Sequence, residues 1–214
     1  MRLRYVKGSK ELIAAHEAIV HDPKELKGRW HEFFGNSNPI RLEIGMGKGK
    51  FLSTLAMQNP DVNYIGIEKY EAVILRALEK KESLELKNLA LICDYASELG
   101  EIFAEGEIDM IYLNFSDPWP KDRHAKRRLT SDTFLEVYKV ILKKGGKVQF
   151  KTDNTALFDY SVERALACGY DVPALTRDLH ASEFAEGNVC TEYEEKFVAE
   201  GKKICFMQAQ YPCK

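Results

Sequence analysis

From residue 40 onward, short apolar runs alternate with segments whose apolar residues recur at helical spacing. The runs are predicted to be strands at residues 40–44, 62–67, 89–93, 108–115 and 147–151. Helices are predicted between them, beginning near Gly49, Tyr70, Ser97 and Ser131. Strands that alternate with helices pair in parallel, because each helix crosses back over the sheet. The pattern therefore predicts an α/β fold with a mainly parallel sheet and helices on both faces.

The two ends of the chain depart from this alternation. Residues 9–20 are predicted to be one helix, and residues 22–35 a second, because Asp22-Pro23-Lys24-Glu25 reads as an N-cap, a first-turn proline and a capping-box glutamate. We therefore expect residues 1–38 to form an N-terminal helical appendage packed on a main domain of residues 39–214. After a helix at 155–168, residues 170–175 and 203–210 are further strand candidates, and the long polar stretch between them favours an antiparallel last strand.

Composition excludes several classes of protein. No stretch free of Asp, Glu, Lys and Arg exceeds ten residues, whereas a membrane-spanning helix needs about 20 apolar ones. The five cysteines are odd in number and no two are separated by two residues, so zinc ribbons and thioredoxin-type motifs are not expected. We expect a cytoplasmic protein with reduced thiols. The net charge of −2 excludes a general basic excess, so any nucleic acid must be met by a local patch.

A glycine-rich turn follows the first predicted strand of the main domain. Gly45, Gly47 and Gly49 lie where an α/β sheet brings a nucleotide-type ligand to the backbone, and a Cβ there is expected to collide with ligand or sheet. In dinucleotide-binding proteins the glycines are spaced GxGxxG, but here the third comes one residue early and position 50 is lysine. Glu43 would also repel a pyrophosphate. An NAD-dependent enzyme is therefore the weakest alternative, and a cationic ligand such as S-adenosylmethionine suits the carboxylate better.

Acids also stand at the ends of the next two strands. Glu68 ends the second strand, where it could accept hydrogen bonds from both ribose hydroxyls, and Asp94 ends the third, where it could meet the adenine edge. The glycines alone are explained by an ordinary strand-to-helix turn. The pair Glu43 and Glu68 favours a methyl-donor site.

The string NFSDPWPK, residues 114–121, ends the fourth strand at the expected switch point of the sheet. Its two prolines hold the backbone extended. Trp119 offers a face on which a base could stack, and Asp117 an acceptor for a base edge. Standing alone, the same string is read more readily as a rigid loop with a core tryptophan and a capping aspartate.

A basic run follows directly. Residues 121–128 carry five lysines and arginines against one aspartate. Such a run is commonly a solvated face, but beside a methyl-donor site it favours RNA, because a phosphate backbone needs a cationic patch and a small substrate does not. The residues expected to contact RNA are Arg123, His124, Lys126, Arg127 and Arg128.

These strings together resemble the bacterial tRNA (guanine-N7-)-methyltransferases. The resemblance spans about residues 39–210 and rests on EIGMGKG (43–49), IGIE (65–68), NFSDPWPK with RHAKRR (114–128), FKTDN (150–154), DLH (178–180) and TEYEEKF (191–197). It implies a Rossmann-like class I methyltransferase fold with a seven-stranded sheet in a catalytic domain of residues 39–214. It also implies S-adenosylmethionine as methyl donor, no metal, and N7 of the variable-loop guanine (position 46) of tRNA as target.

The resemblance assigns roles by motif position. The residues implied to bind the cofactor are Glu43, Gly45, Gly47, Glu68, Asp94 and Asp117, and Asp117 is also the catalytic candidate. The residues implied to bind substrate are Lys121, Asp153, Thr191, Glu192, Tyr193 and Glu194. Tyr95 stands where a small residue is common, and Asp122 interrupts the basic run, so the adenine pocket and the patch are expected to differ from those of relatives.

Guanine N7 carries a lone pair and no hydrogen, so methyl transfer to it needs no general base. In-line placement and nearby acids would suffice. Asp117 could accept hydrogen bonds from N1–H and N2–H₂ and so select guanine over adenine. The division of roles among Asp117, Asp153 and Glu194 stays open.

Two other classes of function remain at this point. A methyltransferase acting on another RNA, a protein or a small molecule would share the glycine loop, although a small-molecule enzyme would have no use for the basic run. A non-catalytic RNA-binding module would have no reason to keep Glu43, Glu68 and Asp117. We expect tRNA as partner, no membrane contact, and either a monomer or a homodimer.

Overall fold

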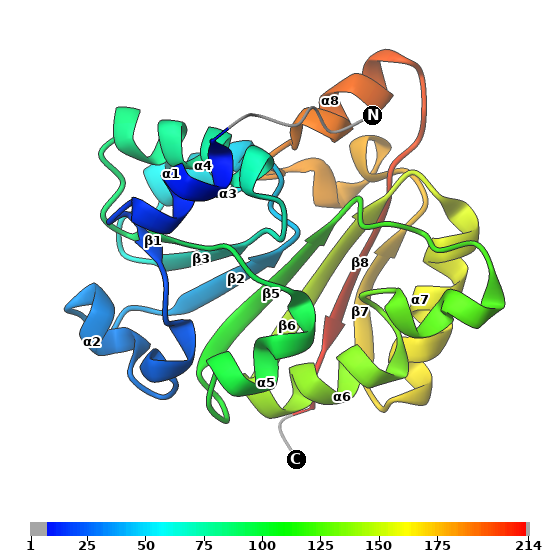
Figure 1. The fold of residues 1–214 in the computed structure, drawn as a ribbon. Coiled ribbons are helices and arrows are strands. Elements are labelled where there is room, and N and C mark those ends of the chain that lie inside the picture. The colour runs from blue at the N-terminus through cyan, green and yellow to red at the C-terminus, as the bar shows by residue number, and fades with distance from the viewer. Residues whose placement is uncertain (1–7, 213–214) are drawn as a thin grey trace.

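The sheet at the centre of the molecule has eight strands in the computed structural model, which describes residues 8–212. Their order is β1-β4-β3-β2-β5-β6-β8-β7, and β8 runs antiparallel to both β6 and β7 while the other pairs are parallel (Figure 1). The strands are β1 Ile19–Val20, β2 Ile40–Ile44, β3 Asn63–Ile67, β4 Leu89–Ile92, β5 Ile108–Asn114, β6 Leu142–Thr152, β7 Asp171–Thr176 and β8 Cys205–Gln210. The α/β class and the antiparallel last strand are confirmed, whereas the count of seven strands is wrong by β1.

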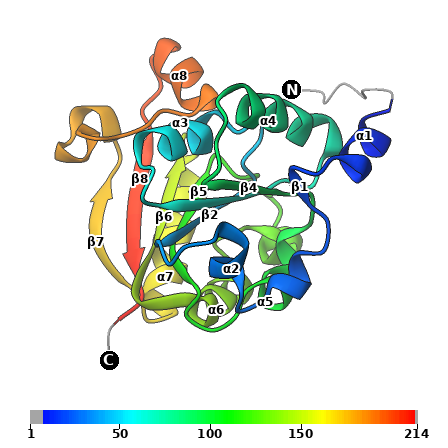
Figure 2. The same ribbon diagram turned by 90° about the vertical axis from the view of Figure 1, so that its left-hand side faces the viewer.

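Helices cover both faces of the sheet. Figure 2 shows α3 and α4 on one face and α5 and α6 on the other, and separate apolar cores lie beneath the two layers. The α8 helix lies above the carboxyl ends of β5 and β6 (Figure 1). The helices are α1 Ser9–Ala15, α2 Trp30–Phe34, α3 Lys50–Gln58, α4 Glu71–Ser83, α5 Leu99–Ile102, α6 Asp132–Ile141, α7 Thr155–Ala167 and α8 Glu192–Ala199. Within the described residues, none of the helices has the length and apolar character needed to cross a lipid bilayer.

The prediction of one helix over residues 9–20 is wrong. The α1 helix ends at Ala15, and the chain turns at His16, which is extended. Ile19 and Val20 then form β1, paired in parallel with Leu91 and Ile92 of β4. A branched, apolar Ile19 that is 3% exposed contributes more at this sheet edge than on a solvated helix. The missing signal is the pairing partner, which lies more than 70 residues away.

The prediction of one helix over residues 22–35 is also wrong, because the segment is split. A 3₁₀ turn covers Pro23–Leu26, and Gly28, with a φ of 75°, interrupts the helical conformation before α2. The Glu107 carboxylate accepts hydrogen bonds from the backbone N–H groups of Gly28 and Trp30. Trp30 is fully buried and donates from Nε1 to the carbonyl of Ile102. Residues 8–38 thus supply a strand and a core side chain, while residues 1–7 of the expected appendage lie outside the described residues.

Two strands in the other half of the sheet, β6 and β7, are irregular. The β6 strand begins at Leu142 rather than at residue 147, and its register with β5 shifts between Ile108 and Met110. The edge strand β7 has a register shift against β8 between Asp171 and Ala174.

The topology sets the place of the site. The chain leaves β2 through α3 toward β3 and leaves β5 toward β6, so the connections diverge between neighbouring strands β2 and β5. In open α/β sheets ligands bind at the carboxyl ends of the strands at such a point.

Candidate active site

The glycine loop joins β2 to α3. Gly45, Gly47 and Gly49 have φ values of 76°, 58° and 72°, which L-residues with a Cβ rarely adopt. A Cβ built at Gly49 would lie 2.7 Å from the Cβ of Ala77, whereas one built at Gly45 or Gly47 meets none of the described atoms within 4 Å. The expected collision with protein therefore holds at Gly49 alone. Beside Gly45 and Gly47 there is room for a ligand.

Glu43 is the next-to-last residue of β2, and it is 2% exposed. Its Oε1 accepts a 2.8 Å hydrogen bond from Nδ2 of Asn114, and its Oε2 has no hydrogen-bond partner within residues 8–212. Burial raises the pKa of Glu43 to about 7, although the Asn114 bond and the charge of Lys151 act in the opposite direction. A buried acceptor without a donor is costly, so this oxygen is suited to a ligand that brings one.

Asn114, at the end of β5, presents a second such acceptor. Its Oδ1 is buried and is also without a partner in the described part of the chain. Sequence reasoning placed Asn114 in a motif but gave it no role. The two free oxygens stand at the ends of adjacent strands, at the point where the connections diverge. An ammonium group, which carries only donors, fits this pair of acceptors.

Glu68 directly follows β3, and Asp94 lies two residues after the end of the neighbouring strand β4. Glu68 is 8% exposed, and it accepts hydrogen bonds from the backbone N–H groups of Gly47 at 3.2 Å and Tyr70 at 3.1 Å. Burial raises its pKa despite these bonds. Asp94 accepts from the N–H of Tyr95, whose side chain is exposed. The structure thus brings Glu43, Glu68 and Asp94 to one edge of the sheet.

The loop after β5 is strained. Phe115 and Trp119 have φ values of 52° and 40°, which are unfavourable for bulky residues. Arg128 holds this loop, because its guanidinium donates to the carbonyls of Pro118 and Trp119 and lies 4.3 Å from the ring centre of Tyr160. Arg128 is 9% exposed, which argues against the RNA contact predicted for it.

The rest of the basic run faces outward. Arg123, Lys126 and Arg127 are exposed on a 3₁₀ helix over Asp122–Arg127. Trp119 is half-buried, with the Arg127 guanidinium 5.0 Å from its ring centre and the His124 ring 5.7 Å away at its edge. Asp117 and Lys121 are exposed on the same loop. These residues form one surface beside the carboxyl end of β5.

The segment at the start of α8 brings together several residues that the resemblance assigns to substrate binding. Thr191 caps the helix: its Oγ1 accepts from the N–H of Glu194, and the Glu194 side chain accepts from the N–H of Thr191. Glu192 pairs with Lys48 and Lys80. Tyr193 is half-exposed, with its ring 6.4 Å from that of Phe115. Asp153, which directly follows β6, lies outside this segment and forms an ion pair with Lys202.

Glu194 is fully buried, unlike Glu192 and Tyr193 of the same segment. Its carboxylate accepts hydrogen bonds from Lys151 at 2.6 Å, His180 at 3.0 Å and Asn188 at 2.7 Å. Burial opposes its ionisation, but the charge of Lys151 and the hydrogen bonds from Lys151, Asn188 and the Thr191 N–H outweigh burial and lower its pKa. Its saturation argues against direct contact with substrate. Sequence reasoning missed Lys151; the available signal was a lysine between Phe150 and Thr152, both of which are buried at the end of β6.

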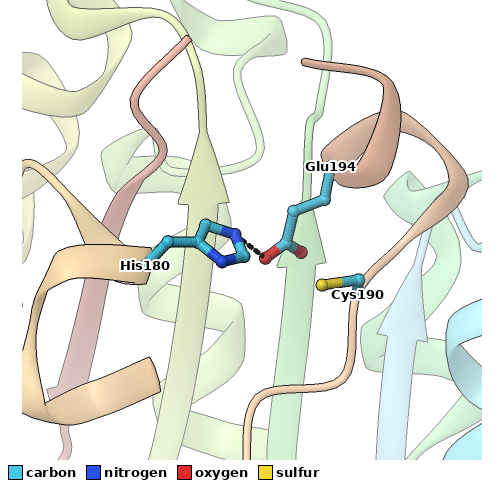
Figure 3. A group of neighbouring side chains, drawn as sticks. All are labelled: His180, Cys190 and Glu194. Atoms are coloured by element: carbon cyan, nitrogen blue, oxygen red, sulfur yellow. Dashed lines mark hydrogen bonds and ion pairs between the residues drawn. The ribbon is translucent and has the colours of Figure 1, made fainter. Parts of the chain in front are cut away.

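The Glu194 carboxylate has two further polar neighbours, His180 and Cys190. A nitrogen of His180, the sulfur of Cys190 and an oxygen of Glu194 lie within 4.8 Å of one another (Figure 3). Such a donor set is of the zinc type. Glu194, however, already binds the ammonium of Lys151, which would repel a metal ion. We therefore describe the group as a hydrogen-bonded cluster.

Comparisons with known proteins agree with this geometry. A family model described as "Putative methyltransferase" matches residues 37–207. Proteins named tRNA (guanine-N(7)-)-methyltransferase are 57% identical over 95% of this chain and 95% of the relative in Lachnoclostridium phytofermentans, and 52% identical over 100% and 97% in a Geobacillus species. Among solved structures, a 16S rRNA methyltransferase is similar with a TM-score of 0.63 at 11% identity, covering 86% of this chain and 93% of that one. A methyltransferase from Aquifex aeolicus has a TM-score of 0.56 at 15% identity, covering 97% and 99%. The structural neighbours show the class I methyltransferase fold.

Proposed function

Since the chain belongs to the tRNA (guanine-N7-)-methyltransferase family, we propose that it transfers the methyl group of S-adenosylmethionine to N7 of the variable-loop guanine, position 46, of tRNA. The observation that carries the proposal is the pair of buried, unpartnered acceptors among the described residues, Glu43 Oε2 and Asn114 Oδ1, beside the open glycine loop. A pyrophosphate would be repelled there. A ligand with an ammonium group would satisfy both oxygens.

The residues that would hold the donor lie along one edge of the sheet. Glu43 and Asn114 would accept from its ammonium, the backbone at Gly45 and Gly47 would border it, and Glu68 would accept from its ribose hydroxyls. Asp94 would meet its adenine. When bound, S-adenosylmethionine supplies an electrophilic methyl group on a sulfonium.

The guanine would approach from the loop after β5. Asp117 would accept from N1–H and N2–H₂, which selects guanine and favours the cationic product. Lys121 is exposed on this loop, and Tyr193 is exposed in α8. Because N7 already has a lone pair, no side chain has to remove a proton and no metal has to activate a nucleophile. The protein's work is placement and electrostatic stabilisation.

The tRNA backbone would lie on the exposed cations Arg123, Lys126 and Arg127, with His124 beside them. The names of the relatives support tRNA as the partner. Such a substrate would be met in the cytoplasm. The target guanine is normally packed in the folded tRNA, so its exposure would cost a few kcal/mol, roughly as for other extruded bases.

The test is transfer of labelled methyl groups from S-adenosylmethionine to unmodified tRNA transcripts that carry either guanine or adenine at position 46. We expect 7-methylguanosine in digests of the guanine transcript and no label in the adenine transcript. Label in both transcripts would contradict the assigned site. Absence of label from both, with donor binding intact by calorimetry, would contradict tRNA as the substrate.

A further inference from the structure

We propose that Lys151 is a positioning residue, whose buried ammonium anchors the segment of residues 188–194 to the end of β6 and so couples the donor site to the tRNA site. The coupling rests on the function proposed above; the anchoring does not. Lys151 lies on β6 opposite Asn114 of β5, and it is fully buried. In the sequence, neither its place at the end of a strand nor its place in the string FKTDN, residues 150–154, predicts a role for its positive charge.

The three N–H donors of Lys151 are matched by three acceptors on that one segment. Nζ donates to Oε2 of Glu194 at 2.6 Å, to the carbonyl of Val189 at 2.9 Å and to Oδ1 of Asn188 at 3.1 Å. The ring of Phe51 lies 4.9 Å from the ammonium on the glycine-loop side. An ammonium taken out of water is tolerated when its donors are all satisfied. Its position therefore requires the segment to keep its conformation.

The ion pairs of the segment with the glycine loop and with α4 are weaker restraints. Glu192 reaches Lys48 and Lys80 through ion pairs in which every side chain is at least one-third exposed. Exposed pairs of this kind contribute little to stability, because water and salt screen the charges. Within the described residues, the hydrogen bonds of the segment to a strand of the sheet all come from Lys151. Loss of Lys151 would free Val189 and Asn188 and leave Glu194 buried without its cation.

The same ammonium acts on the donor site. Asn114, the strand neighbour of Lys151, donates to Glu43, and the charge of Lys151 favours the ionised form of Glu43 against burial and against the nearby Glu68. A row of groups therefore crosses the ends of three strands, from Glu43 through Asn114 and Lys151 to Glu194. One cation serves both the acid that would hold the donor and the acid that caps α8.

A purely structural ion pair would affect folding alone, and a double variant separates the two roles. Lys151→Met strands the Glu194 charge, whereas Lys151→Met with Glu194→Gln removes both charges and keeps the acceptors for His180 and Asn188. The matched control is Lys143→Met, because Lys143 lies at the opposite end of β6 in an exposed 2.8 Å pair with Asp109. Thermal unfolding, hydrogen exchange without tRNA, donor binding by calorimetry, and KM and kcat on tRNA would be measured.

For the double variant we expect an unfolding temperature close to that of the wild type, faster exchange of the amides of residues 188–194, weaker donor binding, and kcat/KM on tRNA lowered by about 100-fold, as for misplaced catalytic geometry. The Lys143→Met control should match the wild type in all four measurements. Wild-type exchange and wild-type kcat/KM in the double variant would overturn the proposal.

If the double variant does not fold, Lys151→Arg decides, since it keeps the charge but cannot reproduce the three bonds of an ammonium. Lower kcat/KM with faster exchange of residues 188–194 supports the proposal, and wild-type values of both overturn it. A wild-type protein inactive on tRNA would contradict the proposed function. The exchange measurement would still test the anchoring by Lys151.

Discussion

Asn114 and Glu43 share one hydrogen bond across the ends of β5 and β2, and each keeps one buried oxygen, Oδ1 of Asn114 and Oε2 of Glu43, that no described residue satisfies. The arrangement pre-forms a site for a cation in the absence of one. Burial raises the pKa of Glu43 to about 7. Both the stability of the ligand-free protein and its affinity for a cationic ligand should therefore depend on pH.

Donor binding should strengthen as the pH rises from about 6 to about 8, since the ammonium of S-adenosylmethionine favours the ionised carboxylate. The charged groups that act on Glu43 are Lys151 and Glu68. Calorimetry in buffers of different ionisation enthalpy should detect proton release on binding at the acid end of this range. Glu43→Gln should bind weakly at every pH, and an equal pH dependence in that variant would show that another group titrates.

Stability of the ligand-free protein should change in the opposite sense. The unfolded carboxyl loses its proton near its ordinary pKa of 4.5, whereas the folded one keeps it to about 7. The folded state therefore binds more protons between these values, and the contribution of Glu43 to stability falls as the pH rises through this window. Urea unfolding of the wild type and of Glu43→Gln across the window should show the loss in the wild type alone.

Asp117→Asn should keep donor binding and lose turnover. Asp117 is exposed on the loop after β5, away from the buried acceptors that would hold the ammonium. An amide in its place presents a donor to guanine N1–H and removes a negative charge near the developing cation. We expect kcat/KM on tRNA to fall by about 100-fold, comparable to loss of one stabilising group at a charged transition state. Turnover near the wild-type rate would remove Asp117 from the catalytic role.

Adjacent arginines of the basic run should behave differently. Arg127 is exposed, so Arg127→Ala should weaken tRNA binding and reduce the slope of log K against log salt by roughly 0.7 to 0.9, as for one lost phosphate contact. Arg128 binds the loop carbonyls, so Arg128→Ala should lower the unfolding temperature and leave the slope unchanged. Filter binding at several salt concentrations checks both. An equal loss of slope in the two variants would place Arg128 on the RNA after all.

The central strands were predictable because their apolar runs are continuous and are separated by clear helical patterns. The Ile19–Val20 strand was not, since two residues show no alternation and their partner Leu91 is distant in sequence. The acids at the strand ends were predictable for a similar reason, because carboxyl ends of parallel strands share one edge. The pairing of Lys151 with Glu194 was not predictable, because the two residues are 43 positions apart in the sequence. Whether they meet depends on the path of the loop, helix and strand between them.

Arg128 shows a third limit. Its neighbours in the basic run are alike in sequence, and the direction in which each points depends on a 3₁₀ helix that ends at Arg127. The positive φ values of Phe115 and Trp119 could not be predicted from composition or spacing either, because bulky residues other than glycine rarely adopt them.

The two outer strands leave little backbone to which another chain could add. The β1 strand offers two residues, and β7 carries Pro173, which has no N–H to donate, within a stretch of irregular register. Growth of the sheet from one molecule into the next is therefore disfavoured at both sides. Copies of this protein that associate in a crowded cell are expected to meet through their helical faces or their loops.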